Sequence, residues 1–482
     1  MNTGAHRVAR NTIVLLIGSG GRMLLSILLQ VLVARWLGVV GLGKYTLLLA
    51  FLNIFQTVSE LGLPALTIRE AARERTATTQ YLYATGSLQV VASVLAWGGM
   101  VGFAALLGYP PDTRLMLLIG GASLIPYALV SATSTVLQAQ ERMTPVVMID
   151  LAGVLLTVAI NIVLMWLGYG VLYLAIAIVI TQGLAAIGSL VVLARLGQLR
   201  PVSWYPALMR ALLRAAPEFF LLTLAVVAFS RMDVLALSRL RGETEVGVYT
   251  AAFLIVNAAN LAFVSYGNAI YPRLAQLFQV DPGRFAQLGE RVSKHALTLA
   301  VPVAVGGFML AGDLIKLAYR SAQYEHSAAA LQVVVWYAVP FALNTVLSRM
   351  LLSSNRQRMS VVVAGTKMVF GLVAYLALIP PLGVVGAALA TVLSALLGTA
   401  LNWFYVARHV ARLRLWRLLF RPGLAALGMA AGLALLKANI FVELACGAAI
   451  YSGLIVALGG VGAEDLAVLR GLWEGRGFTG TR

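Results

Sequence analysis

Fourteen long apolar segments constrain this chain more than any other feature of its sequence. Each segment is predominantly apolar and about 20 residues long, the length that an α-helix needs to cross the hydrocarbon core of a bilayer. The segments run over 11–34, 43–66, 81–107, 115–138, 146–167, 171–194, 216–237, 247–270, 296–318, 328–350, 361–380, 384–406, 422–437 and 440–460. Because backbone groups inside a bilayer have no water to bind, we expect these segments to be helices. The predicted fold class is an all-α integral membrane protein with about 14 transmembrane helices.

The positive charge of the chain is explained by its placement relative to these segments. The chain is 60% hydrophobic and 11% charged, with a formal net charge of +18. With the N-terminus placed on the cytoplasmic side, 24 of the 36 basic residues fall in inner segments and six fall in outer loops. This asymmetry predicts a multi-pass protein with both termini in the cytoplasm. Nucleic acid is therefore not an expected partner.

The chain also contains an internal repeat, which appears when the sequence is shifted by 204 positions. Residues 35–71 then align with residues 239–275. The matched pairs include Arg35 with Arg239, Gly38 with Gly242, Gly43 with Gly247, Tyr45 with Tyr249, Asn53 with Asn257 and Arg69 with Arg273. Two copies of six helices share one orientation because six is even. We therefore expect two parallel lobes related by a pseudo-twofold axis along the membrane normal.

The repeat divides the chain into three parts. We assign 1–200 to an N-lobe with helices 1–6, 201–408 to a C-lobe with helices 7–12, and 409–482 to helices 13 and 14 and a cytoplasmic tail. Such an architecture predicts a substrate site between the lobes and alternating access by rocking of the lobes. A channel is the alternative, but the sequence has no segment that resembles a selectivity filter or a re-entrant loop.

The repeated element resembles a known family. ARWLGVVGLGKYT and SELGLPALTIREAARE in the first copy, and SRMDVLALSRLRGETEVGVYTAA in the second, are similar to bacterial oligosaccharide and polysaccharide (O-antigen-type repeat unit) flippases of the multidrug/oligosaccharidyl-lipid/polysaccharide exporter superfamily. The resemblance implies a flippase in the bacterial cytoplasmic membrane that carries an undecaprenyl-pyrophosphate-linked oligosaccharide from the inner to the outer leaflet. It also implies a polysaccharide polymerase and glycosyltransferases as candidate partners.

Ionisable residues within the spans are the candidate site residues, because charges in a bilayer usually face a protein interior or a cavity. They are Arg22, Glu60, Asp150, Glu218, Arg231, Asp233 and Lys367. Four more lie near span ends, where they can snorkel to the interface, and are set aside: Lys44, Asp313, Lys316 and Arg349.

Three of the candidates are basic, and we expect them to bind the substrate. Pyrophosphate needs several cationic donors, and a planar guanidinium suits it geometrically. The predicted substrate-binding residues are Arg22, Arg231 and Lys367. The carboxylates Glu60, Asp150, Glu218 and Asp233 are candidates either for ion coupling or for structural contacts between helices.

The spacing of Arg231 and Asp233 separates their roles. Residues at i and i+2 point about 200° apart on a regular helix, so the two side chains cannot face the same cavity. We expect Arg231 to face the cavity and Asp233 to contact a neighbouring helix, with the reverse assignment left open.

Other function classes leave distinct traces. A drug or organic-cation antiporter of the same superfamily should have a cavity dominated by carboxylates, and a peptidoglycan-precursor flippase should share the cationic cavity. A membrane glycosyltransferase or polymerase should have a sizeable outer loop, whereas the outer loops here have about a dozen residues or fewer. No histidine lies deep in a span, and GVVGLGKY at 38–45 lacks the hydroxyl of a nucleotide-binding loop. We therefore expect no catalytic residue, metal or cofactor.

Overall fold

The chain is built from helices, as the sequence predicts. The computed structural model describes residues 3–74, 77–198, 204–411, 415–436 and 438–460, and contains no strand within them. The α-helices are α1 (Thr3–Glu60), α2 (Leu63–Arg73), α3 (Thr78–Leu106), α4 (Pro111–Gly121), α5 (Leu124–Ala139), α6 (Met143–Trp166), α7 (Val171–Arg195), α8 (Pro206–Ser230), α9 (Met232–Arg241), α10 (Glu243–Val280), α11 (Pro282–Met309), α12 (Ala311–Tyr319), α13 (Glu325–Val334), α14 (Ala338–Ser353), α15 (Gln357–His409), α16 (Leu415–Leu435) and α17 (Ile440–Ala457). Two short 3₁₀ helices, η2 (Ala322–Tyr324) and η3 (Val335–Tyr337), flank α13.

Two of these helices fold back on themselves. The backbone of α1 leaves the helical conformation at Gly38, and that of α15 does so at Gly383. Ser26 and Asn53 line one cavity, although a straight helix would place them about 40 Å apart. Among the described residues, twelve helical segments are long and apolar enough to cross a membrane, and they include both of these folded helices. Counting each folded helix as two spans gives the predicted fourteen. Below, residues 3–37 are called the first arm of α1 and residues 39–60 its second arm.

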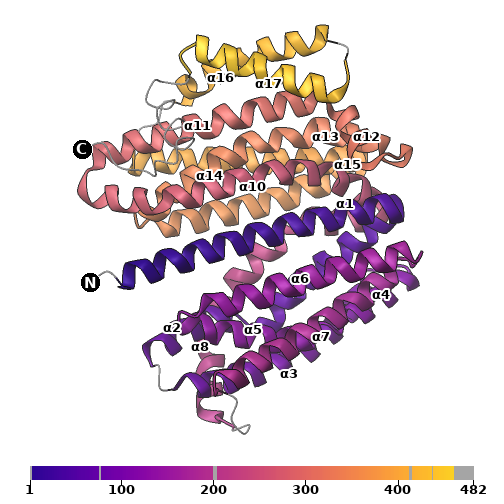
Figure 1. Ribbon diagram of the computed structural model, residues 1–482, viewed down its shortest axis with the longest axis vertical. Helices are drawn as coiled ribbons and strands as arrows, with labels where there is room; N and C mark the ends of the chain where they lie inside the picture. Colours follow the sequence, from indigo (N-terminus) through magenta and orange to yellow (C-terminus); the bar gives the residue numbers. More distant parts are fainter. Residues whose placement is uncertain (1–2, 75–76, 199–203, 412–414, 437, 461–482) are drawn as a thin grey trace. The chain divides into compact units, whose positions relative to one another are not determined.

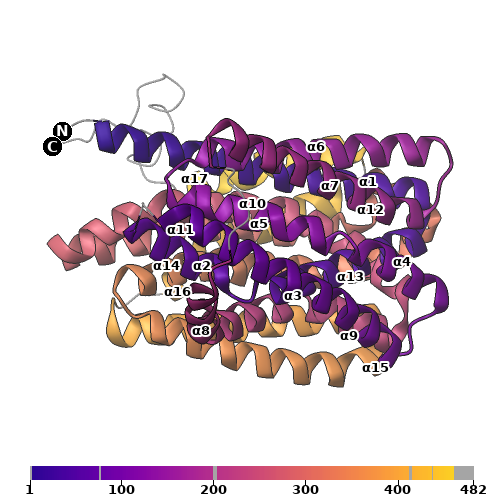
Figure 2. The same cartoon turned by 90° about the horizontal axis from the view of Figure 1, so that it is seen from below.

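The described residues group into two compact units, each treated separately here. The first contains Met1–Leu254 with Tyr375–Ala387, and the second contains Ile255–Ala374 with Ala388–Arg482. In the first unit, the first arm of α1 runs beside α6, and α6 packs against α7 (Figures 1 and 2). In the second, α11 packs against α14 and α16, and α16 pairs with α17. The first unit includes α8 and α9, which we assigned to the C-lobe, so the lobe boundaries stay a prediction.

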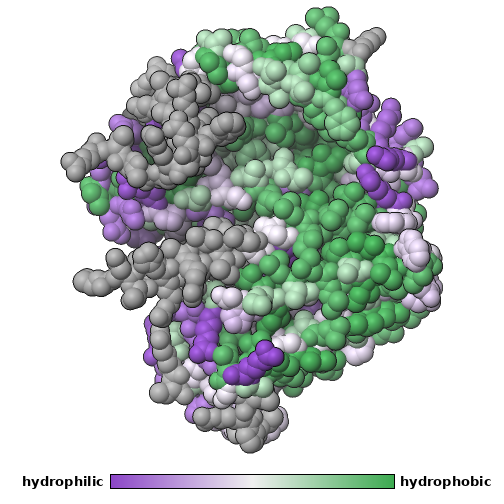
Figure 3. All heavy atoms as spheres, in the orientation of Figure 1, coloured by the Kyte–Doolittle hydropathy of each residue, from purple (hydrophilic) through white to green (hydrophobic). Residues whose placement is uncertain are grey.

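Large apolar side chains cover much of the helix surface. Leu95, Leu106 and Trp166 in the first unit are each more than 70% exposed, as is Leu435 in the second. On the face drawn in Figure 3, hydrophobic residues extend along the visible helices, and hydrophilic ones gather near helix ends. Apolar exposure on this scale fits contact with lipid tails.

The repeat has a direct structural counterpart in the first unit. Gly38 (φ 67°, ψ −169°) and Gly242 (φ 90°, ψ 177°), which the repeat aligns, adopt the same unusual backbone conformation. A β-carbon added at Gly43 would collide with the carbonyl oxygen of Glu243, and one added at Gly247 would collide with that of Val39. The shift of 204 positions converts the first of these contacts into the second. Such reciprocity is the mark of a local twofold axis.

Replacing Gly242 tests the backbone requirement at this turn. A positive φ with extended ψ is essentially restricted to glycine and costs other residues about 1–3 kcal/mol. No atom lies within 4 Å of a β-carbon added at Gly242, so only the backbone strain changes. We expect Gly242→Ala to lower the unfolding temperature of the purified protein in detergent.

The matched control is Gly98→Ala, at an open position within α3. Alanine has the higher helix propensity, so this variant should be as stable as the original protein or slightly more stable. Equal unfolding temperatures for the two variants would contradict the strained turn.

Candidate functional site

A polar cavity of about 440 Å³ lies within the first unit. Both arms of α1 line it together with α5, α6 and α7. Its polar lining residues are Arg22, Ser26, Gln30, Tyr45, Thr46, Asn53, Gln56, Tyr127, Asp150, Thr157, Thr181, Gln182 and Arg231. The fold of α1 at Gly38 creates this lining, because it brings polar positions of both arms to the same space. The cavity can therefore offer cations and many neutral hydrogen-bonding groups to a ligand.

Arg22 and Asp150 form an ion pair across this cavity wall. The Arg22 Nη1 and Asp150 Oδ2 atoms are 3.0 Å apart, and the two side chains are 56% and 52% exposed. Their helices approach closely, because a β-carbon added at Gly18 would collide with the side chain of Val147 on α6. Exposed pairs of this kind contribute little to stability, so the guanidinium can exchange its partner at low cost.

Arg231 lines the same cavity from an unexpected backbone position. The apolar run predicts a regular helix over 216–237, and that prediction is wrong: α8 ends at Ser230, α9 begins at Met232, and Arg231 joins them with φ −120° and ψ 3°. The buried Arg231 Nε has no hydrogen-bond partner among the described residues. Arg22 and Arg231, predicted separately from sequence, therefore line one cavity.

Asp233 makes contacts within the protein and is not a lining residue of this cavity. The Tyr249 hydroxyl on α10 donates a hydrogen bond of 3.1 Å to its Oδ2 atom. The backbone N–H of Val234 donates another, of 2.8 Å, to its Oδ1 atom. The carboxylate thus links α9 to a neighbouring helix.

The remaining candidates lie in different surroundings. Glu60, at the end of α1, accepts hydrogen bonds from the hydroxyls of Tyr127 (2.8 Å) and Ser131 (3.1 Å), and Tyr127 also lines the cavity. Glu218 is exposed on α8. Lys367 belongs to the second unit, on α15, and is not among the residues that line this cavity. Its side chain runs past Gly398 on the same folded helix.

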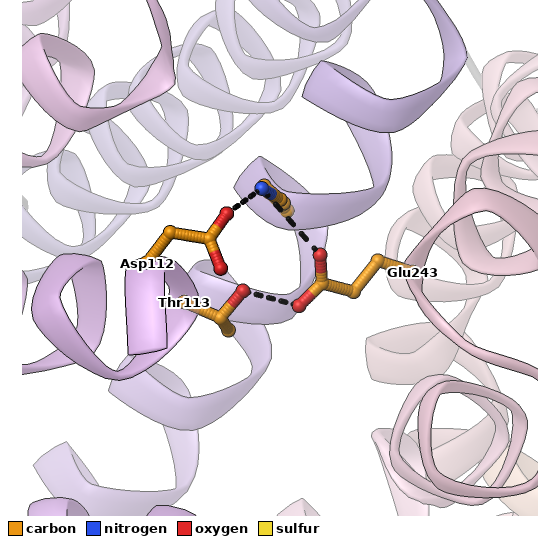
Figure 4. A network of polar contacts seen from close by, with 4 residues as sticks. Asp112, Thr113 and Glu243 are labelled. Atoms are coloured by element: carbon orange, nitrogen blue, oxygen red, sulfur yellow. Dashed lines mark hydrogen bonds and ion pairs between the residues drawn. The ribbon is translucent and has the colours of Figure 1, made fainter. Parts of the chain in front are cut away.

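Lys44, set aside as a residue near a span end that can snorkel to the interface, takes part in a polar network. Its ammonium group contacts the carboxylate of Asp112 and lies 3.8 Å from Glu243 Oε2 (Figure 4). The hydroxyl of Thr113 donates to the other Glu243 oxygen. The Lys44 side chain is only 19% exposed and that of Glu243 only 12%. We call Lys44, Asp112, Thr113 and Glu243 the turn network, because it adjoins the Gly38 and Gly242 turns.

Further contacts secure the same end of the first unit. The hydroxyls of Tyr109 and Ser238 are 2.6 Å apart, and both residues are buried. Burial raises the pKa of the Tyr109 hydroxyl above its usual value, which keeps it protonated. Glu245 Oε2 accepts a hydrogen bond of 3.1 Å from the backbone N–H of Val384. Sequence reasoning missed these contacts, although the proximity of Lys44 and Glu243 to the aligned glycines was a usable signal.

The candidate site holds no obvious metal centre. Within the part of the chain that the structure describes, no three His, Cys, Asp or Glu side chains are grouped closely enough to hold a metal ion. The arrangement suits an anionic, hydroxyl-rich ligand bound by guanidinium, amide and hydroxyl groups.

Two family models match more than half of the chain each. The model described as polysaccharide biosynthesis protein matches residues 8–278, and the model described as lipid II flippase MurJ matches residues 171–452. The chain is 24% identical over 398 residues to a probable flippase, AglR, from Haloferax volcanii, and the match covers 78% of each chain.

Solved structures show the same fold at low sequence identity. An inward closed conformation of the lipid II flippase MurJ superposes with a TM-score of 0.77 at 15% identity, covering 92% of this chain and 98% of that one. An inward-facing multidrug resistance MATE family transporter of the MOP superfamily gives 0.61 at 14% identity, covering 80% and 95%. A MOP superfamily transporter from Pyrococcus furiosus, whose binding pocket is described as having reverse polarity, gives 0.58 at 13% identity, covering 84% and 95%.

Two acidic residues with similar partners should differ in their effect on stability. Asp150 is half-exposed beside Arg22, so Asp150→Ala should change the free energy of unfolding by less than about 1 kcal/mol. The Glu243 side chain is only 12% exposed and binds both Lys44 and Thr113, so Glu243→Ala should cost more, about 1–3 kcal/mol. Unfolding of both purified variants in the same detergent measures the difference. Equal losses of unfolding free energy in the two variants would show that Glu243 is no better shielded from solvent than Asp150.

Proposed function

This chain belongs to the polysaccharide biosynthesis protein family and is a flippase of the multidrug/oligosaccharidyl-lipid/polysaccharide exporter superfamily, and on that premise we propose that it carries an undecaprenyl-pyrophosphate-linked oligosaccharide from the inner to the outer leaflet of the cytoplasmic membrane. The observation that carries this proposal is the lining of one polar cavity by Arg22 and Arg231. Pyrophosphate is a strong match for guanidinium groups, which bind phosphate oxygens in a bidentate manner.

The ion pair on the cavity wall gives the headgroup a way to enter. Asp150 accepts a hydrogen bond from Arg22. An incoming pyrophosphate carries more charge and more acceptor oxygens than one carboxylate, so it replaces Asp150 as the partner of Arg22. Amide side chains such as Gln30, Asn53 and Gln56 then bind sugar hydroxyls, while the polyprenyl tail stays in the lipid.

The net charge of the cavity favours this cargo over organic cations. Among the described residues that line the cavity, the Arg, Lys, Asp and Glu side chains are Arg22, Arg231 and Asp150, and two of these three are basic. An exporter of organic cations should instead surround its cargo with carboxylates. The role of Lys367 as a third cation for the headgroup remains part of the proposal.

A lipid-linked peptidoglycan precursor is the second candidate cargo. The lipid II flippase model matches residues 171–452, and this cargo carries the same polyprenyl pyrophosphate. Expression of this chain in cells depleted of their own lipid II flippase separates the candidates. Restored growth would assign the peptidoglycan precursor, and unrestored growth with normal polysaccharide export would assign the oligosaccharide.

The proposed mechanism is alternating access, with the turn network as a contact that must open. The sequence places the Gly38 and Gly242 turns at the outer face. There, Glu243 on α10 contacts Lys44 on the second arm of α1 and Thr113 on α4. Release of cargo to the outer leaflet requires these groups to separate and become hydrated, and the next inward-facing state requires them to rejoin.

Removal of either cavity arginine should impair export. Loss of a charge-assisted hydrogen bond costs about 1.5–3 kcal/mol, which is about tenfold or more in affinity. We therefore expect Arg22→Ala and Arg231→Ala each to lower surface polysaccharide at least severalfold, at unchanged protein level, in cells that depend on this chain. Arg114→Ala removes an exposed arginine from α4 and serves as the control. Unchanged export in both cavity variants would contradict the proposal.

Locking the turn network should stop transport reversibly. Cys446, the single cysteine, is first replaced by serine, and cysteines are then placed at Thr113 and Glu243. A short bifunctional methanethiosulfonate reagent should cross-link the pair and abolish export, and a reducing agent should restore it. Each single-cysteine variant, treated in the same way, is the control. Full export by a quantitatively cross-linked protein would show that this contact does not need to open.

A further inference from the structure

A second cavity, of about 550 Å³, lies within the second unit. Most of its lining residues lie outside the six-helix repeats. Its walls come from α11, from the first turns of α16 and from Gly460, just after α17. The distribution of basic residues predicts that this end of the three helices lies at the cytoplasmic face. Its volume falls within the range of about 300–1,000 Å³ that is usual for small-ligand sites.

The cavity is basic. Lys294 on α11 and Arg421 on α16 line it, and the described residues that line it include no carboxylate. The Arg421 Nη1 atom donates to the carbonyl oxygen of Gly459, which fixes the guanidinium and leaves its other N–H groups for an additional acceptor. The cavity also adjoins the N-terminal turn of α16, where the helix dipole favours an anion. These groups together suit a phosphate.

Aromatic side chains at this cavity indicate that it lies at a membrane interface. Trp416 and Phe420 line the cavity, are 77% and 56% exposed, and have ring centroids 6.1 Å apart. Tryptophan is enriched where the apolar and polar layers of a bilayer meet. The basic groups therefore lie at headgroup depth.

An apolar stripe on α16 begins at the cavity. Phe420, Leu424 and Leu427 follow one another at i, i+4 and i+7, which places them on one face of the helix. All three are exposed, and Leu427 is 68% exposed. A ligand with an anionic head and a long apolar chain fits a basic cavity that continues into such a stripe, whereas a soluble anion would use only the cavity.

We propose that this cavity binds the phosphate headgroup of an anionic glycerophospholipid of the inner leaflet, with an acyl chain along Phe420, Leu424 and Leu427. Basic pockets between transmembrane helices on the cytoplasmic side are known to hold such headgroups. A glycerophospholipid is favoured over the cargo because α16 and α17 lie outside the repeated helices that form the predicted transport lobes. The site binds a resident lipid and is independent of which saccharide is carried.

The test measures lipid binding to the purified, delipidated full chain in detergent by native mass spectrometry. We expect phosphatidylglycerol to bind at least about tenfold more tightly than phosphatidylcholine of the same acyl chains. Lys294→Gln and Arg421→Gln should each weaken phosphatidylglycerol binding about tenfold, as expected for one charge-assisted bond to phosphate. Arg356→Gln, which removes an exposed charge at the start of α15 in the same unit, should leave binding unchanged.

Several outcomes would overturn the proposal. They are equal affinity for the two phospholipids, unchanged binding in Lys294→Gln, and displacement of phosphatidylglycerol by millimolar inorganic phosphate. Displacement by a much lower concentration of undecaprenyl phosphate would reassign the site to the cargo. Lys294→Gln remains informative if Arg421→Gln fails to fold, because it leaves the bond to Gly459 intact. Since the assay needs neither cargo nor export, its result is separate from that of the proposed flippase function.

Discussion

The close approach of two glycine-bearing turns is the contact on which the first unit depends. Gly43 lies against the carbonyl oxygen of Glu243, and Gly247 lies against that of Val39. No other residue type allows the two backbones to come this close, because any β-carbon would occupy the space of an oxygen atom. The contact holds the second arm of α1 against the start of α10.

The charges of the first unit are treated in two different ways, and the difference matches the proposed function. The side chains of Lys44 and Glu243 are only 19% and 12% exposed beside the glycine turns, where Asp112 and Thr113 provide further polar contacts. Arg22 and Asp150 are half-exposed on a cavity wall, where a partner can be exchanged. A largely buried, paired group of charges at one end and a half-exposed ion pair in the cavity fit the proposed flippase function.

Much of this organisation is present in the sequence. The apolar segments predict the helices and their number, because the thickness of a bilayer fixes the length of a spanning helix. The shift of 204 positions aligns Gly38 with Gly242, but the turns at these glycines are found only in the structure, from their positive φ angles. Arg22 and Arg231 could be selected because charges are rare in such segments. The break in the helix at Arg231 could not be predicted, because SRMDV contains neither glycine nor proline and an uninterrupted helix is the natural expectation. The burial of Lys44 was also missed, because it depends on Asp112 and Glu243 approaching from distant parts of the chain.

Reconstitution offers the most direct test of the central claim that the chain moves a lipid-linked oligosaccharide across a bilayer. The purified protein is placed in vesicles that contain a short polyprenyl-pyrophosphate-linked oligosaccharide with a fluorescent sugar, and a membrane-impermeant reductant is added outside. In protein-free vesicles only the outer-leaflet half of the fluorescence should be lost. With the protein present, we predict that nearly all of it is lost. A persistent protected half, in vesicles where the same protein transports a cationic dye, would contradict the account.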